Sequence, residues 1–244
     1  MLPVDEPPLT AELIRSRHDA LLRRLRAAAE AAGREPDALR LVAITKGFGT
    51  AVIREATAAG LSRFGENRVQ EAIPKMSAAP GAEWHLVGHL QANKARPALR
   101  GFAAIHSVDS LELLTRLDRI AAEESRSPAI LLQVNVTGEG SKAGFALGWF
   151  EEASRRPGPL STALAGLAAV RLSGLMTIGP AGVPPEESRQ CFATLRRLRD
   201  ELQELTGSAL PELSMGMTAD AEAAVAEGAT LVRVGTAIFG PRPA

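Results

Sequence analysis

From residue 41 onward, short apolar segments alternate along the chain with longer amphipathic ones. The apolar segments have the length of buried strands, and the segments between them space their apolar residues three and four apart, as helices do. Eight such apolar segments occur, at residues 41–45, 62–66, 84–88, 103–107, 130–135, 171–177, 212–216 and 230–235. Helical patterns follow each of the first seven, which is typical of strand-helix units around a parallel sheet.

Eight strands with alternating helices favour a closed (β/α)8 TIM barrel of the α/β class over residues 41–240. An open doubly wound sheet is the alternative, because a strand count made from sequence can be off by about one element. Ahead of the barrel, Thr10 can cap an extra N-terminal helix over residues 10–32 that stops at Gly33. No Pro-rich or Ser-rich linker divides the alternation, so residues 1–244 are predicted to form a single domain.

The charge balance argues against a polyanionic partner. Lys plus Arg and Asp plus Glu both number 28, so the chain has no overall field that would draw nucleic acid or an anionic membrane. No uncharged stretch is long enough to span a membrane, and residues 1–10 lack the basic and apolar regions of a signal peptide. The single cysteine, Cys191, cannot form an internal disulfide and suits a reducing compartment. We therefore expect a cytoplasmic protein that binds neither nucleic acid nor membranes.

The first apolar strand is followed directly by Lys46. A lysine in this position either extends to water or is partly desolvated, and desolvation favours the neutral, nucleophilic amine. Barrel enzymes build their sites from residues at the carboxyl ends of the strands, which is where Lys46 lies. Two interpretations follow: a solvated surface lysine, or a nucleophile that forms a Schiff base with a carbonyl compound.

The last strand and its turn, LVRVGTAIFG, combine an arginine with a candidate anion site. Arg233 alternates with valines in an apolar strand, so it is predicted to point into the barrel, where a buried guanidinium needs an acceptor. Gly235 and Thr236 follow at the strand end. Backbone N–H groups of such a turn can hold a phosphate, although the glycine can also serve the turn alone.

Three further segments carry weaker signals. In SMGMTAD, Thr218 is either a second phosphate ligand or a helix N-cap, and in FGEN, Asn67 either orients a ligand or caps the next helix. His85 and His89 are four residues apart without a Glu between them or a third ligand, so no metal site is predicted.

An amine nucleophile that faces phosphate-binding turns, with an arginine between, fits a phosphorylated carbonyl compound held as an imine.

The same segments resemble the pyridoxal phosphate homeostasis proteins (the YggS/PROSC family). The matching segments are AITK, FGENRVQE, WHLVGHLQANK, IHSVD, QVNVTGEGSKAGF, GLMTI, LSMGMTAD and LVRVGTAIFG, in this order between residues 41 and 240. The resemblance implies a barrel like the N-terminal domain of alanine racemase, with pyridoxal 5′-phosphate (PLP) bound as an imine to Lys46. It also implies that Arg233 lies at the pyridine nitrogen, that Thr218, Gly235 and Thr236 hold the phosphate, and that Asn67 and Ser214 contribute to cofactor binding.

Two positions depart from the pattern of that family. Thr218 stands where a serine is usual and keeps the hydroxyl, whereas Arg68 stands where a tyrosine is usual and cannot replace the ring.

The resemblance also bears on turnover. An arginine opposite the pyridine nitrogen does not readily supply a proton, so the ring is a poor electron sink. Racemases of this fold use a tyrosine from a separate domain as second base, and this chain has no tyrosine. We therefore expect a monomer without catalytic residues that stores, buffers or delivers PLP, with apo PLP-dependent enzymes as partners. The alternative is a Schiff-base enzyme, either an amino-acid racemase or a sugar-phosphate aldolase.

Overall fold

The computed structural model describes residues 9–242, so the Pro-rich start and the last two residues lie outside the described part. The strands are β1 Arg40–Ile44, β2 Arg63–Glu66, β3 Glu83–Leu86, β4 Ala104–Val108, β5 Ala129–Asn135, β6 Phe145–Ala146, β7 Arg171–Met176, β8 Glu212–Ser214 and β9 Leu231–Val234. The α-helices are α1 Ala11–Ala31, α2 Thr50–Ala58, α3 Val69–Met76, α4 Ala95–Gly101, α5 Leu111–Glu123, α6 Leu147–Ala153, α7 Pro159–Ala165, α8 Pro185–Thr206, α9 Ala221–Ala226 and α10 Thr236–Phe239. Two short 3-10 helices, η1 Pro36–Ala38 and η2 Ala92–Lys94, precede β1 and α4.

Eight parallel strands close into a barrel. The ring runs β1-β2-β3-β4-β5-β7-β8-β9, and β9 pairs with β1. Because β4 pairs with β5 as well as with β3, the ring has no open edge, which excludes the open doubly wound sheet and confirms the TIM barrel. The two-residue β6 pairs with β5 outside this ring and had no counterpart among the eight predicted strands.

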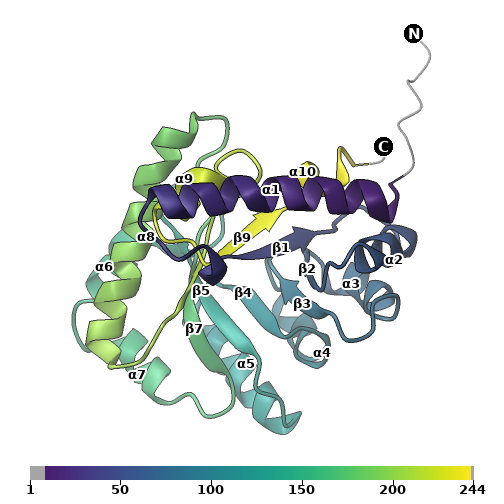
Figure 1. Cartoon of the computed structure of the whole chain (residues 1–244). Coiled ribbons are helices and arrows are strands. Elements are labelled where there is room, and N and C mark those ends of the chain that lie inside the picture. Colours follow the sequence, from purple (N-terminus) through teal and green to yellow (C-terminus); the bar gives the residue numbers. More distant parts are fainter. Residues whose placement is uncertain (1–8, 243–244) are drawn as a thin grey trace.

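The predicted N-terminal helix is present as α1 (Figure 1). The Thr10 hydroxyl accepts a hydrogen bond from the Leu13 N–H, and Gly33, at φ 67°, takes the left-handed conformation that lets the chain leave the helix. The helix contacts α2, α9 and α10 through a buried stripe that includes Ile14, Leu21 and Leu25. It therefore covers the outside of the barrel where the first and last strands meet.

Side chains of each strand divide between two cores. Leu41 and Ala43 belong to the large core between the strands and the helices, whereas Val42 and Ile44 belong to a small core within the barrel. This alternation is the pleat of the strand, so Lys46, two residues beyond Ile44, continues the inward series. The helix-facing core is thus large and apolar, while the barrel interior ends in polar side chains at both mouths.

Within residues 9–242, no helix combines the length and the apolar character needed to cross a membrane.

Candidate functional site

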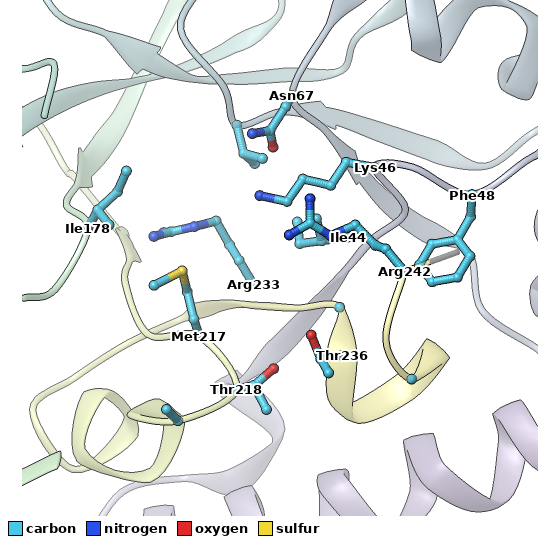
Figure 2. A pocket seen from close by; sticks show the side chains of 14 residues that line it. Ile44, Lys46, Phe48, Asn67, Ile178, Met217, Thr218, Arg233, Thr236 and Arg242 are labelled. Atoms are coloured by element: carbon cyan, nitrogen blue, oxygen red, sulfur yellow. The ribbon is translucent and has the colours of Figure 1, made fainter. Parts of the chain in front are cut away.

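A cavity of about 350 Å³ opens at the carboxyl ends of the strands (Figure 2). Six of the seven predicted site residues line it: Lys46, Asn67, Thr218, Arg233, Gly235 and Thr236. Its remaining lining is mainly apolar and consists of Ile44, Phe48, Val87, Ile178, Met217, Ala219, Gly240 and Arg242. Predicted site residues that are up to 190 positions apart in the sequence, from Lys46 to Thr236, thus share one opening.

Lys46 is half-buried, and its side chain extends into this cavity (Figure 2). The chain has four lysines, and the other three lie elsewhere. Lys75 is buried against Glu66 and Glu71, Lys142 is paired with Glu139, and Lys94 lies at a separate hollow beside His89. Lys46 is therefore the lysine that the fold presents to the cavity.

Lys75 holds the backbone on both sides of Lys46. Its ammonium donates to the Thr45 carbonyl at 2.8 Å and to the carboxylates of Glu66 and Glu71 at 2.6 and 2.8 Å. The same Glu71 oxygen accepts the Gly47 N–H at 2.6 Å. Burial raises the pKa of Glu66, and this influence outweighs the opposing hydrogen bond from Lys75. The turn that carries Lys46 is thus fixed by a buried cation and two carboxyl groups.

Arg233 points inward, as the alternation of its strand predicted. It is 5% exposed, and its Nη1 donates to Ser214 Oγ at 2.7 Å while Nη2 donates to the Thr177 carbonyl at 2.8 Å. Burial lowers the pKa of Arg233 to about 10, against the raising influence of Asp220, so the guanidinium remains a cation at neutral pH. A guanidinium has five N–H donors, and the hydrogen bonds of Arg233 within residues 9–242 use two of them.

Ser214 is the one predicted site residue that does not line the cavity. It is fully buried, and its hydroxyl lies behind Arg233, where it also contacts His106 Nδ1 at 2.8 Å. A direct contact between Ser214 and a cofactor stays a prediction, whereas its contact with Arg233 is present in the structure.

Donors to an anion gather at the end of the cavity formed by the turns after β8 and β9. The hydroxyls of Thr218 and Thr236 point toward the gap between them (Figure 2). Thr236 begins α10, so the N–H groups of Thr236 and Ala237 have no acceptor within that helix. Asp220, rather than Thr218, is the N-cap residue of α9, which leaves the Thr218 hydroxyl free of that role.

Asn67 faces the cavity rather than capping the next helix. The N-cap residue of α3 is Arg68, and no side-chain hydrogen bond caps that helix. The Asn67 backbone lies so close to β3 that a Cβ on Gly88 would come within 2.4 Å of its carbonyl oxygen, which fixes where Asn67 lies. Arg68, the departure from the family pattern, is exposed and lines the separate hollow with Lys94.

Arg242 is a cavity residue that the sequence analysis did not identify. Its side chain passes over Gly47 and reaches toward Lys46 and Arg233 (Figure 2). It follows the last helix and carries no periodic signal; its only mark in the sequence is its place just after FG.

Among residues 9–242, no three His, Cys, Asp or Glu side chains lie close enough together to bind a metal ion. His89 instead contacts Asp109 at 2.8 Å near the surface. Cys191 is buried, and burial raises the pKa of its thiol to about 11, so it is a poor nucleophile.

Comparison with known proteins extends this description. The profile of the family described as "Alanine racemase, N-terminal domain" matches residues 17–243. A pyridoxal phosphate homeostasis protein of Pseudomonas aeruginosa is 43% identical over 221 residues, which cover 90% of this chain and 91% of that protein. A protein of the same name from Synechocystis sp. is 40% identical over 210 residues, covering 85% and 93% of the two chains.

Two solved structures show how far the likeness extends. The structure of PipY from Synechococcus elongatus, with PLP bound, has a TM-score of 0.78 at 42% identity and covers 93% of this chain and 100% of PipY. An alanine racemase of Clostridium difficile has a TM-score of 0.68 at 13% identity and covers 91% of this chain but 57% of the racemase. The second likeness is one of fold alone.

Proposed function

The chain belongs to the family of the pyridoxal phosphate homeostasis proteins, and on this premise we propose that it binds PLP in the cavity at the barrel mouth and takes part in PLP homeostasis by storing, buffering or delivering the cofactor. The observation that carries the proposal is the convergence of Lys46, Arg233 and the donors of Thr218 and Thr236 on one cavity.

The residues of the cavity suit the parts of PLP one by one. Lys46 is the amine that would form an imine with the aldehyde. Arg233 would face the pyridine nitrogen, and the hydroxyls of Thr218 and Thr236, with the N–H groups after Gly235, would donate hydrogen bonds to the phosphate. The apolar side chains of Ile178 and Met217 would lie against the flat ring. Asn67 would contact the ring from the β2 side.

The same residues argue against turnover. PLP supplies an electron sink for carbanion chemistry, and that sink is strongest when the ring nitrogen is protonated. Arg233 is a guanidinium that donates hydrogen bonds but keeps its proton, so it does not protonate the ring nitrogen. No tyrosine occurs in the sequence to act as a second base. We therefore propose a binding protein without racemase, transaminase or decarboxylase activity.

Exchange of the cofactor follows from how open the cavity is. Thr218, Thr236 and Met217 are exposed, so water and a receiving protein have access to the bound ligand. We propose that residues 1–244 act as one PLP-binding domain, as a monomer in the cytoplasm, and that apo PLP-dependent enzymes receive the cofactor.

Two assays on the PLP-loaded protein test this function. In the first, the protein is mixed with an apo PLP-dependent enzyme, and the recovered activity of that enzyme is followed; in the second, single L-amino acids are incubated in deuterated water, and the α-proton is followed by NMR. We expect cofactor transfer without catalytic α-proton exchange. Catalytic exchange that disappears in Lys46→Ala, without transfer, would instead establish the racemase-like alternative.

A further inference from the structure

A line of polar side chains crosses the barrel interior from the amino ends of the strands to the cavity, and all of them are buried except Glu83, which is half-exposed at the amino end. It begins at Glu83, the first residue of β3, and passes through His85, His106 and Ser214 to Arg233. The successive contacts are 2.9 Å from Glu83 Oε1 to His85 Nε2, 2.8 Å from His85 Nδ1 to His106 Nε2, 2.8 Å from His106 Nδ1 to Ser214 Oγ, and 2.7 Å from Ser214 Oγ to Arg233 Nη1. Four strands contribute to it, so only the folded barrel assembles it.

The ends of this line decide where each proton lies. Glu83 is an acceptor only: its hydrogen bond from His85, helped by Arg63, lowers the pKa of its carboxyl to about 2. His85 Nε2 must therefore carry a proton. At the other end Arg233 can only donate, so Ser214 Oγ must accept from it.

The protons between the ends follow in turn. Burial lowers the pKa of His85 and, more strongly, that of His106, so both rings are neutral and each has one donor and one acceptor nitrogen. With its proton on Nε2, His85 accepts at Nδ1 from His106 Nε2–H. His106 then accepts at Nδ1 from the Ser214 hydroxyl. If both rings instead carried their protons on Nδ1, the lone pair of His85 Nε2 would face the carboxylate of Glu83, which is repulsive.

We propose that Glu83, His85 and His106 are positioning residues for Arg233 and act through Ser214. Together they form a hydrogen-bonded line in which each bond has one fixed donor and one fixed acceptor. Each bond polarises the next, so the charge of Glu83 makes Ser214 Oγ a stronger acceptor for the guanidinium. Arg233 is thereby held toward the cavity, although no carboxylate within residues 9–242 pairs with it. This inference deepens the proposed function, because it rests on Arg233 facing the ring of PLP.

The charged groups around the chain are consistent with this order. Glu83 raises the pKa of His85, but burial outweighs it, and Arg63 and Arg40 act in the same direction as burial. Arg233 also lowers the pKa of His106, so the surrounding cations favour neutral rings. Asp220 acts on Arg233 from the turn after β8 and raises its pKa, which keeps the donor end charged.

The first test uses the protein without cofactor, so it does not depend on PLP binding. Long-range ¹H–¹⁵N NMR on histidine-labelled protein reports the tautomer of each ring. The protein has four histidines. His18 and His89 do not belong to the hydrogen-bonded line, and the substitutions His18→Gln and His89→Gln remove their signals from the spectra. We expect His85 and His106 to be neutral Nε2–H tautomers at pH 7. A proton on Nδ1 of either ring, or an imidazolium, would overturn the proposal.

The second test compares two carboxylates at the amino ends of the strands. Glu83→Gln removes the charge at the end of the chain, and Glu212→Gln removes the neighbouring carboxylate, which pairs with Arg40 and lies outside the chain. Two ligands are titrated: PLP and its carbocyclic analogue, in which a C–H replaces the ring nitrogen.

We expect Glu83→Gln to weaken PLP about tenfold more than Glu212→Gln does, and to change the affinity for the analogue little, because only PLP uses Arg233. Equal losses in the two variants, or equal losses for the two ligands, would show a merely structural role and overturn the proposal. If Glu83→Gln does not fold, the histidine tautomers of the native protein, measured by NMR, still test the proposed hydrogen-bonded line. If the native protein binds neither ligand, the proposed function fails while the NMR result stands on its own.

Discussion

Lys46 on one side of the cavity and Thr218 and Thr236 on the other can be changed without opening the core. Lys46 follows the inner core of the barrel, and the threonines at the other side bear exposed hydroxyls. Substitutions here therefore report on the ligand more than on the fold.

Replacing Lys46 by Ala should abolish the visible absorption band of the PLP-loaded protein and leave the unfolding transition nearly unchanged. The side chain is half-buried at the mouth, so its truncation leaves no enclosed cavity. Absorption spectra and urea unfolding measure the two effects. Lys94→Ala is the matched control, because Lys94 lines the separate hollow, and it should keep the band. A band that survives in Lys46→Ala would place the imine on another amine.

Replacing Thr236 by Val should weaken PLP by about 1 to 3 kcal/mol and weaken pyridoxal much less, since only the phosphorylated ligand uses this hydroxyl. Fluorescence titration with both ligands measures the difference. Thr194→Val removes a hydroxyl that bonds within α8 to the Gln190 carbonyl and should affect neither ligand. Equal weakening of PLP and pyridoxal by Thr236→Val would move the phosphate away from the turn after β9.

At the scale of elements, α3 positions the turn after β1. Its Lys75 reaches the Thr45 carbonyl, and its Glu71 accepts the Gly47 N–H, so the helix holds both neighbours of Lys46. This helix thereby links the packing of the outer layer to the geometry of the cavity.

Lys75→Met should lower the free energy of unfolding by about 3 to 5 kcal/mol, because it leaves Glu66 buried without its cation. The double variant Lys75→Met, Glu66→Gln should recover part of this loss, since no buried charge is then left unpaired. Urea unfolding of the two variants measures the recovery. A single variant as stable as the native protein would show that Lys75 does not hold the turn.

Elements were predictable from sequence where their signals are local. Eight apolar runs mark the eight barrel strands, and Thr10 and Gly33 mark the ends of α1. The strand β6 was missed, because two residues have no periodicity. The places of Lys46 and Arg233 in the fold were predictable, because the end of a strand and the alternation of side chains along a strand are local features.

Contacts between distant strands were not predictable. The line from Glu83 to Arg233 depends on the register of β3, β4, β8 and β9, which no single segment encodes. The contacts of Ser214 with His106 and Arg233 depend on those same registers, while its contact with a cofactor stays a prediction. Arg242 was missed since it follows the last element.

For the whole molecule, the buried histidines predict a loss of stability in mild acid. Burial lowers the pKa of His106 well below 6.5 and also lowers that of His85. Below about pH 6.5 the unfolded chain binds protons that the folded rings do not bind. The free energy of unfolding therefore decreases as the pH falls, by about 1.4 kcal/mol per pH unit for His106, whose pKa is the more strongly lowered. Above pH 6.5 neither ring contributes to the slope.

Urea unfolding of the native protein and of His106→Gln between pH 5.5 and 8.5 measures this effect. The variant should lose less stability on going from pH 7.5 to 5.5, whereas the two proteins should have parallel profiles between pH 7.5 and 8.5. Parallel profiles over the whole range would mean that the pKa of His106 is the same in the folded and the unfolded protein, as for a ring open to water, and would contradict this prediction.

Borohydride reduction of the PLP-loaded protein, followed by peptide mass spectrometry, shows whether the cavity holds PLP as an imine on Lys46. The proposed imine on Lys46 predicts one phosphopyridoxyl group, on that lysine. A reduced group on Lys75, Lys94 or Lys142 instead, or no modified lysine in a protein saturated with PLP, would contradict it.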